Sequence, residues 1–593
     1  MSAHGDHNSG SAASHRRLWK DHKTAAGLVG CCLLVHAVLA FQVACYNCVT
    51  HDEFWHIPAG VWNLKTGRFH YDNLNPPMPR VLAAIPLVLS GVSTGDVAED
   101  ADKETRADEF VVANGDRYHR YIVLARTTTI ALSLITAVVM ASWAFELFGP
   151  GAAVLSSFLW CMTPDILAHG SLVTSDAPAA LSMLLMFRSV WKHALAPNMR
   201  PALWMGLAFG TAQLVKFTCI VGIPLACGVW CLFRFRNAQA APAKGKTIAG
   251  QWLFAAVICL LTINLGYLLQ GTLRPLNSFQ FQSQAMQSLR DSFPLPNFRV
   301  PLPADFVEGI DHQRSIMEQQ HPIYLDGLWS FSGFPDYYIK TWWYKTPHQI
   351  QLLCVLTLIG LMFSSQRSRE LPLQICLLLP VFLLGFIASR TSMQLGNRYL
   401  LPAFPFLFLF ASQMASFGRR PFGGPQILAA VLAISMLWTA VLKNHPLHLS
   451  YFNELAGGPE QGRFHLIDSN IDWGQDLLAL KEFVDRNQIT DLKLAYFGMI
   501  VPTRVGLKFT VPVAETLQPG WHAISVTFVQ GKPHTIREPD GGYHSVDFNA
   551  FGWARMFRPK QAIGHSILLY DLSAADAARV RSAAPAAREH QSQ

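Results

Sequence analysis

The sequence predicts a polytopic α-helical membrane protein that ends in a small soluble α/β domain. Only 15% of the 593 residues are charged, and the mean hydropathy is +0.23. Long apolar runs alternate with short basic connectors, which is typical of a multi-pass membrane protein. The formal net charge of +8 lies mainly in those connectors. It therefore indicates membrane topology rather than binding to nucleic acid.

The chain begins with a polar segment, residues 1–23, that is too long for the start of a usual cleaved signal peptide. We therefore expect the first apolar run to remain as a signal anchor and residues 1–23 to form a cytoplasmic tail. A span needs about 20 apolar residues. Eleven runs are predicted to cross the membrane: 24–46, 121–147, 150–168, 174–191, 201–215, 217–233, 248–270, 348–364, 372–389, 398–416 and 425–443.

One further apolar run, residues 81–92, is shorter and contains Pro86. Its length favours a helix at the membrane interface over a span. If it does not cross, the basic clusters near 16–23, 188–200, 234–246, 367–369 and 419–420 all fall on one side. The positive-inside rule makes that side cytoplasmic. The outer loops 47–120 and 271–347 and the region after 444 then face outward.

The region 445–575 has short alternating runs, such as "DLKLAYFG", "HAISVTFV" and "HSILLYDL", and one helical run, "GQDLLALKEFVDRN". This mixture predicts a small extracytoplasmic α/β domain. Within it, Asp468, Asp472 and Asp476 would form a carboxylate stripe on a continuous helix, but Asn470 and Gly474 favour a loop followed by a helix cap. The Ala-rich, polar segment 576–593 is predicted to be disordered.

An acidic pair, Asp52 and Glu53, directly follows the first span on the outward side, within "HDEFWH". Two carboxylates at a membrane boundary are expensive to place there without a use. No ATP or nucleotide sugar is present at an outward surface, so a transferase there must take its activated group from a lipid carrier. A sugar linked to polyprenyl phosphate carries a good leaving group, and one general base is then sufficient. Asp52 or Glu53 is the candidate for that base.

Three cations, Arg80, Lys216 and Arg398, are predicted at the outer ends of spans or on the outer loop. They are candidates for holding the carrier phosphate, and interface anchoring by snorkelling is the alternative for each. Asp176 either caps the start of a span or positions Asp52 or the acceptor. His169 either contacts the acceptor or anchors a span end at the interface.

Several motifs in this chain resemble those of one enzyme superfamily. "HDEFWHIPAG", "TGRF" and "NPPMPRVLAA" resemble the first outer loop of the GT-C glycosyltransferases, in the branch of protein O-mannosyltransferases and aminoarabinose transferases. "HLSYFNELAGGPEQG" and "DSNIDWGQDL" are similar to the opening of the C-terminal domain in bacterial carrier-dependent glycosyltransferases. Further matches recur in the same order: "ARTTT", "ELFGPGAA", "TPDILAHGSLVTSDAP", "LAFGTAQLVKFT", "YYIKTWWYKTP" and "NRYLLPAFP".

The resemblance implies a GT-C fold in a bacterial inner membrane, with Asp52 as the base and Asp176 as the second outer-loop aspartate. His56, His169, Asp176 and Lys345 are then candidates for binding the acceptor or the sugar. Aminoarabinose transferases carry a Lys where this chain has Asn75, and Arg80 is expected to replace it. No cofactor or metal is firmly implied, although a divalent metal is compatible with the resemblance. The loop 271–347 is too short for the β-trefoil domain of eukaryotic O-mannosyltransferases.

These observations favour an inverting glycosyltransferase that moves a sugar from a polyprenyl-phosphate carrier to an extracytoplasmic protein, lipid or glycan. The bilayer and the carrier-linked sugar are its expected partners. A lipid-linked-sugar transporter or flippase is one alternative, which predicts charges deep within spans and paired broken helices. A catalytically inactive scaffold is another.

Overall fold

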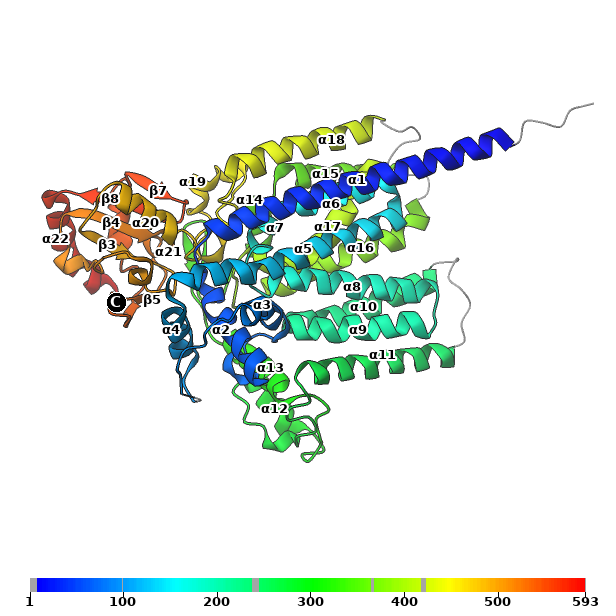
Figure 1. Cartoon of the computed structure of the whole chain (residues 1–593), viewed down its shortest axis with the longest axis horizontal. Coiled ribbons are helices and arrows are strands. Elements are labelled where there is room, and N and C mark those ends of the chain that lie inside the picture. The colour runs from blue at the N-terminus through cyan, green and yellow to red at the C-terminus, as the bar shows by residue number, and fades with distance from the viewer. Residues whose placement is uncertain (1–7, 99, 237–244, 364–366, 417–422, 592–593) are drawn as a thin grey trace, which may run out of the picture.

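A computed structural model describes residues 8–98, 100–236, 245–363, 367–416 and 423–591. It shows a helical bundle with a mixed α/β domain at one end (Figure 1). The predicted connectors 237–244 and 417–422 lie outside the described residues. The eleven predicted spans correspond to α1 (Asn8–Tyr46), α5 (Tyr118–Phe148), α6 (Pro150–Cys161), α8 (Asp176–Leu195), α9 (Met199–Val215), α10 (Gly222–Arg236), α11 (Gly245–Gly266), α15 (His348–Met362), α16 (Arg367–Ser389), α17 (Phe404–Ser412) and α18 (Gly424–Met436).

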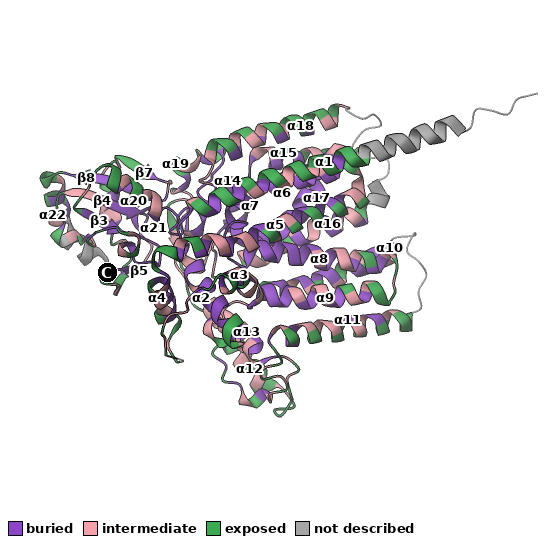
Figure 2. Ribbon diagram, viewed as in Figure 1, coloured by how far each residue is buried: buried purple, intermediate pink, exposed green. Residues whose placement is uncertain are grey.

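The apolar content of this bundle makes the chain a multi-pass membrane protein. Within the described ranges, seven segments are long and apolar enough to cross a membrane: His22–Tyr46, Lys103–Phe148, Phe217–Arg234, Gly245–Gly266, Leu371–Ser389, Asn397–Ser416 and Gly424–Asn444. Figure 2 shows mainly exposed and intermediate residues on α11 and α18. Their exposed side chains include Leu253, Leu265 and Ile434, as expected for helices that face lipid.

Two predicted spans are interrupted at their outer ends. The run 150–168 contains α6, which ends at Cys161, and the short helix α7 (Pro164–His169). Proline at 164 has no N–H to donate to the preceding turn, so it ends α6 and starts a new helix. The run 398–416 begins as a 3₁₀ segment, η5 (Asn397–Ala403), before α17. These breaks place irregular backbone beside the candidate site.

The first outer loop contains α2 (His51–Thr66), η1 (His70–Asp72), α3 (Met78–Leu89) and α4 (Lys103–Asn114). The predicted interfacial run lies in α3, whose 12 residues span about 18 Å, well short of the roughly 30 Å hydrocarbon core of a bilayer. α2 and α3 approach closely, because a Cβ at Gly60 would lie 2.2 Å from the carbonyl oxygen of Arg80. Both helices lie at the end of the bundle that meets the α/β domain (Figure 1).

The second outer loop contains the helices α12 (Gln284–Ser292), α13 (Ala304–Met317) and α14 (Tyr337–Lys345) and the short hairpin β1 (Ile323–Leu325) and β2 (Leu328–Ser330). It has its own small core, in which Leu276, Phe279, Phe281 and Val307 are buried together. This core lies in the first part of the loop, whereas Ile323 and Tyr338 of the second part are buried in the main core with residues of the bundle.

The C-terminal domain is built on a four-stranded sheet in the order β3–β4–β8–β7. β3 is parallel to β4, and β8 is antiparallel to both β4 and β7. The predicted runs contain the strands β3, β4 and β8, and the predicted helix is α20, but the last four residues of the run 522–529 form the short helix α21 instead of a strand. The elements are β3 (Leu492–Ala495), β4 (Gly520–Ser525), β7 (Gln561–Ile563), β8 (Ile567–Leu572), α20 (Leu477–Arg486), α21 (Val526–Val529) and a separate hairpin of β5 (His534–Arg537) and β6 (Tyr543–Val546).

The segment 576–593, which the sequence predicts to be a disordered end, is helical as far as Gln591 in the structure. Helix α22 runs from Ala574 to Gln591. The polar, Ala-rich composition predicts disorder because it offers little apolar surface to bury. Alanine also has the highest helix propensity, so the same composition favours a helix.

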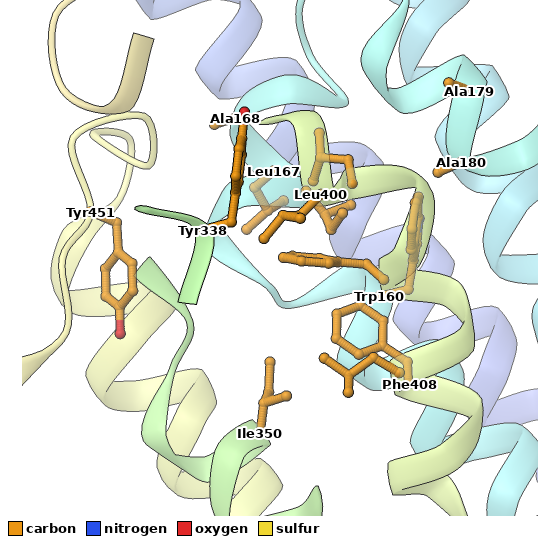
Figure 3. Packing of buried hydrophobic residues seen from close by; sticks show 14 of the residues in the cluster. Trp160, Leu167, Ala168, Ala179, Ala180, Tyr338, Ile350, Leu400, Phe408 and Tyr451 are labelled. Atoms are coloured by element: carbon orange, nitrogen blue, oxygen red, sulfur yellow. The ribbon is translucent and has the colours of Figure 1, made fainter. Parts of the chain in front are cut away.

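The core of the bundle holds the outer-end segments in place. Trp160 of α6 lies 6.4 Å from Phe408 of α17, ring centroid to ring centroid, in an edge-to-face contact. Leu400 of η5 and Leu167 of α7 lie side by side in the same cluster (Figure 3). The buried residues continue through α2 into the C-terminal domain (Figure 2). The position of η5, and with it Arg398, is thus fixed by packing.

Candidate active site

The candidate site begins at the first turn of α2. Thr50 precedes the helix in an extended conformation, and Glu53 accepts a hydrogen bond from the Thr50 N–H at 3.0 Å. This contact belongs to a capping box, in which the side chain of the third helical residue satisfies the N–H of the residue that precedes the helix. The backbone of this turn is also held from outside, because the His51 N–H donates to the Trp473 carbonyl at 3.0 Å. Asp52 therefore projects from a fixed helix end.

Glu53 faces away from Asp52 and into the core. Its two oxygens accept from Arg126 Nε at 2.9 Å and from Arg126 Nη2 at 2.6 Å, and neither side chain is exposed. Glu53 also accepts from the Val173 N–H at 2.8 Å. Glu53, the second candidate for the base, uses its hydrogen-bonding capacity inside the protein. Its contacts are those of a positioning residue.

Asp52 lies in a cavity of about 410 Å³ between the bundle, the outer loops and the C-terminal domain. The structure brings Asp52, Asp176, Lys216 and Arg398 together in its wall. Residues from both outer loops and Tyr399 of η5 complete this side. The loop residues include His51, Trp55, His56, Asp72, Asn75, Lys103, Gln313 and His321.

The four charged groups form one connected network. Arg398 Nη1 donates to Asp52 Oδ2 at 2.7 Å and lies 3.8 Å from Asp176 Oδ2. Lys216 pairs with the other oxygen of Asp176. Asp176 is the first residue of α8 and makes no cap, since Ser175 occupies the N-cap position. Asp176 therefore does not cap the start of α8. Its carboxylate instead contacts Lys216 and Arg398, which are contacts typical of a positioning residue.

Aromatic rings hold the two cations in place. The Arg398 guanidinium lies 4.4 Å from the Trp473 ring centroid, and Lys216 Nζ lies 4.7 Å from the Tyr399 ring centroid. Arg398 Nε is buried and has no hydrogen-bond partner among the residues that the structure describes. An unpaired buried N–H on a cation is costly, and Arg398 is one of the residues that line the cavity.

Asp52 is the accessible carboxylate of this network, with its side chain 27% exposed compared with 3% for Asp176. Burial disfavours the charged form, but the Arg398 guanidinium and the neighbouring histidines hold the pKa of Asp52 well below its usual range. Asp52 is thus ionised, and it is a weak base as long as Arg398 remains bound to it.

A second layer of charges supports His56 and contains Arg80. His56 Nδ1 lies 2.8 Å from Asp72 Oδ2, and Arg80 Nη1 donates to the same oxygen at 3.3 Å. Arg80 also donates to Asn63 at 2.7 Å and to the Asn75 carbonyl at 2.9 Å. Burial opposes charging of His56, but its hydrogen bond to Asp72 raises its pKa. Arg80 is 3% exposed and is not part of the main cavity wall, so it supports the site from behind.

Two residues expected to bind the acceptor or the sugar lie outside the cavity. Lys345 is buried and donates to the carbonyls of Leu449 at 2.8 Å and Asn470 at 2.7 Å. Burial lowers the pKa of Lys345 to about 8, and its contacts fasten α14 to the C-terminal segment. His169 is buried with its ring 5.9 Å from the Trp473 ring. Both residues pack behind the site.

Several residues of this site are not predicted from the sequence. Arg126 had a signal, since an arginine within an apolar run is a functional candidate by default. Asp468, Trp473, Phe497, Lys532 and His534 of the C-terminal domain also line the cavity, and no sequence pattern connects them to the first outer loop. Within the described part of the chain, no group of three or more His, Cys, Asp or Glu side chains is arranged to hold a metal ion.

No protein-family model matches this chain, and no curated protein matches it in sequence. The chain is similar to the crystal structure of ArnT from Cupriavidus metallidurans bound to undecaprenyl phosphate, at 12% identity and a TM-score of 0.46, covering 93% of this chain and 99% of that one. It is similar to the archaeal oligosaccharyltransferase AglB from Archaeoglobus fulgidus, in complex with an inhibitory peptide and a dolichol-phosphate, at 10% identity and a TM-score of 0.45, covering 88% and 74%. It is also similar to the S. cerevisiae protein O-mannosyltransferase Pmt1-Pmt2 complex bound to the sugar donor, at 16% identity and a TM-score of 0.32, covering 52% and 40%.

Proposed function

We propose that the protein is an inverting glycosyltransferase that moves a sugar from a polyprenyl-phosphate carrier to a hydroxyl group on the outer side of the membrane. One observation carries this proposal: Asp52 shares a cavity with Lys216 and Arg398, and the buried Nε of Arg398 has no partner among the described residues. The cavity thus combines a candidate base with two cations that can bind a phosphate. The motif resemblance of the first outer loop supports the same class, the GT-C glycosyltransferases.

The chemistry needs one displacement. The acceptor hydroxyl oxygen attacks the anomeric carbon, and the bond from that carbon to the phosphate oxygen breaks. The electron pair of that bond leaves with the polyprenyl phosphate, and the hydroxyl proton goes to Asp52. Attack from the face opposite the phosphate inverts the anomeric centre. Lys216 and Arg398 stabilise the charge that develops on the leaving phosphate.

Binding of the donor and activation of the base are coupled through Arg398. In the present structure Arg398 binds Asp52, which keeps the carboxylate weakly basic. The donor phosphate, a phosphodiester with one negative charge, competes with Asp52 for the same hydrogen-bond donors and weakens their pairing. The pKa of Asp52 then rises towards its ordinary value of about 4. Asp52 is consequently a better proton acceptor when the donor is bound than when the site is empty.

The charge distribution favours an enzyme over a transporter. A transporter or flippase is expected to carry charges along the depth of its spans. Here the Asp52, Asp176, Lys216 and Arg398 network lies where the bundle meets the outer loops and the C-terminal domain. The intact ion network also argues against an inactive scaffold. We place the protein in a bacterial inner membrane, with the N-terminus in the cytoplasm and the cavity outside.

Removing either cation should weaken binding of the carrier phosphate. A charge-assisted hydrogen bond contributes about 1.5–3 kcal/mol, so Lys216→Ala and Arg398→Ala should each raise the Kd for undecaprenyl phosphate roughly ten- to a hundredfold. The measurement is a titration of the full chain in lipid nanodiscs. Lys560→Ala, which removes an exposed cation of the C-terminal domain, is the matched control. Wild-type affinity in both cavity variants would refute the phosphate site.

The orientation of the chain can be tested by labelling. Single cysteines at the exposed positions Asp100 and Asp540 should react with a membrane-impermeant maleimide in intact spheroplasts, and a cysteine at the exposed position Asn198 should react only after the membrane is opened. The native Cys45 is exposed and is replaced by serine in all variants. The reverse pattern would show that the cavity faces the cytoplasm.

A further inference from the structure

The C-terminal domain contributes its own polar cluster to the cavity, which the displacement chemistry does not use. Asp468 and Lys532 form an ion pair in the cavity wall, with side chains 16% and 13% exposed. The rings of His534 and Phe497 lie beside them in the same wall, with ring centroids 4.8 Å apart. Lys532 Nζ lies 5.8 Å from the Phe497 ring centroid. Two charges of opposite sign are thus presented next to aromatic surface.

This cluster is held in a fixed position relative to Asp52. The His51 ring stacks on Phe497, with centroids 6.0 Å apart, and meets the His534 ring edge-on at 5.3 Å. His51 Nδ1 in turn lies 3.5 Å from Asp52 Oδ1. His51 therefore connects the candidate base with the C-terminal cluster through direct contacts.

Asp468 lies in a tight turn that its own carbonyl and side chain stabilise. Asp468 has a φ of +60°, a left-handed conformation that non-glycine residues rarely adopt. Its carbonyl accepts from the N–H groups of Ile471 and Asp472 at 2.9 Å, and its Oδ1 accepts from the Ser469 N–H at 2.6 Å.

The charges of the cluster suit an uncharged, polyhydroxylated ligand. Burial opposes ionisation of Asp468, but Lys532 lowers its pKa to about 2, so the two charges neutralise each other. Hydroxyl groups can donate to the carboxylate and accept from the ammonium group without separating the pair. An anionic ligand would have to draw Lys532 away and leave a largely buried carboxylate without its partner, which is costly. The His51 and His534 rings, which are partly exposed and rest against the buried Phe497, can pack against the C–H faces of a sugar ring.

We propose that Asp468, Lys532 and His534, together with His51 and Phe497, form the acceptor subsite and that the acceptor is an uncharged saccharide. This inference rests on the proposed function and specifies the acceptor class for the same cavity. A saccharide bound to this cluster lies next to Asp52 through His51, so one of its hydroxyls is placed for attack on the donor. The C-terminal domain then selects the acceptor, and the bundle holds the carrier.

The test uses the full chain in nanodiscs saturated with undecaprenyl phosphate, so that the phosphate site is filled. Binding of methyl α-D-mannopyranoside, methyl α-D-glucopyranoside and methyl β-D-galactopyranoside is measured by saturation-transfer NMR titration. Asp468→Asn and Lys532→Met should each weaken glycoside binding roughly tenfold, because each removes a hydrogen-bonding charge. Lys560→Met disrupts the exposed Lys560–Asp571 pair of the same domain and should have no effect. Undecaprenyl phosphate affinity should stay within twofold in all three variants, which shows that they are folded.

Three results would overturn the inference. They are no glycoside binding to the wild-type chain, glycoside binding that neither Asp468→Asn nor Lys532→Met weakens, and binding of a serine- and threonine-containing peptide or of glycerol 3-phosphate that both variants weaken instead. Failure of the wild-type chain to bind undecaprenyl phosphate would contradict the proposed function separately. In that case the same glycoside titration without carrier still decides whether the cluster binds saccharides.

Discussion

Replacing Asp52 with asparagine should lower turnover by about two to four orders of magnitude, the usual contribution of a general base. Asparagine keeps the shape of the side chain but cannot accept the hydroxyl proton. Turnover is measured as polyprenyl phosphate released from a membrane extract that contains the carrier-linked sugars, and the product anomer is determined by NMR. Near-normal turnover, or retention of the donor's anomeric configuration, would show that Asp52 is not the base of a single displacement.

The same variant should bind the carrier more tightly than the wild-type chain. Asp52 and the phosphate compete for Arg398, whose Nη1 lies 2.7 Å from Asp52 Oδ2. Asparagine carries no charge and competes less, so the Kd for undecaprenyl phosphate should fall roughly tenfold. Glu53→Gln is the matched control, because it makes the same chemical change one residue along but outside the cavity, and it should leave the affinity unchanged. Weaker binding in Asp52→Asn would mean that Asp52 contacts the donor through an attractive interaction instead.

The convergence of Asp52, Lys216 and Arg398 follows from topology that the sequence contains. The sequence predicts each of these residues at the outer end of a span or directly after one. The outer ends of all spans in a bundle lie at the same membrane surface, so these residues are expected near one another. Positive-inside asymmetry then selects which ends face outward. The cavity that joins the three residues agrees with that reasoning. The same reasoning predicts that Arg80 binds the phosphate. Arg80 lies on the juxtamembrane helix α3, however, and the position of a span end does not determine which side of that helix faces the cavity.

Which of the two neighbours, Asp52 or Glu53, faces the cavity could not be predicted from the sequence. Successive side chains on an α-helix point about 100° apart, so two neighbours at a helix start face different surroundings. Which of them faces the cavity depends on how α2 packs against α3 and α5. Asp468 and Lys532 line the cavity because of the way the C-terminal domain packs on the bundle. No local sequence pattern predicts that contact.

Arg126 offers the strongest test of how α2 is positioned. Its five N–H donors all have acceptors: two on Glu53 and the carbonyls of Ala44 and Asn47 at 2.7 Å and of Cys48 at 2.7 Å. These carbonyls belong to the end of α1 and the connection to α2. One fully buried guanidinium thus joins the first span, the connection and the helix that carries Asp52.

Replacing Arg126 with methionine should lower the free energy of unfolding by about 3–5 kcal/mol, because it leaves Glu53 charged and buried without a partner. Lysine should restore only part of the loss, since it has three donors and no planar fork. The measurement is denaturant or thermal unfolding of the purified chain in detergent. Arg314→Ala, which breaks an exposed pair with Glu318, is the control and should cost at most about 1 kcal/mol.

A double variant separates the ion pair from simple loss of packing. Adding Glu53→Gln to Arg126→Met removes the unpaired buried charge while keeping an amide that accepts from the Val173 N–H, so the double variant should be more stable than Arg126→Met alone. If stability is instead lost additively, the two residues do not act as a pair. Undecaprenyl phosphate binding should persist in the double variant, because neither residue lines the cavity, whereas turnover should fall as the first turn of α2 loses its anchor and Asp52 its alignment.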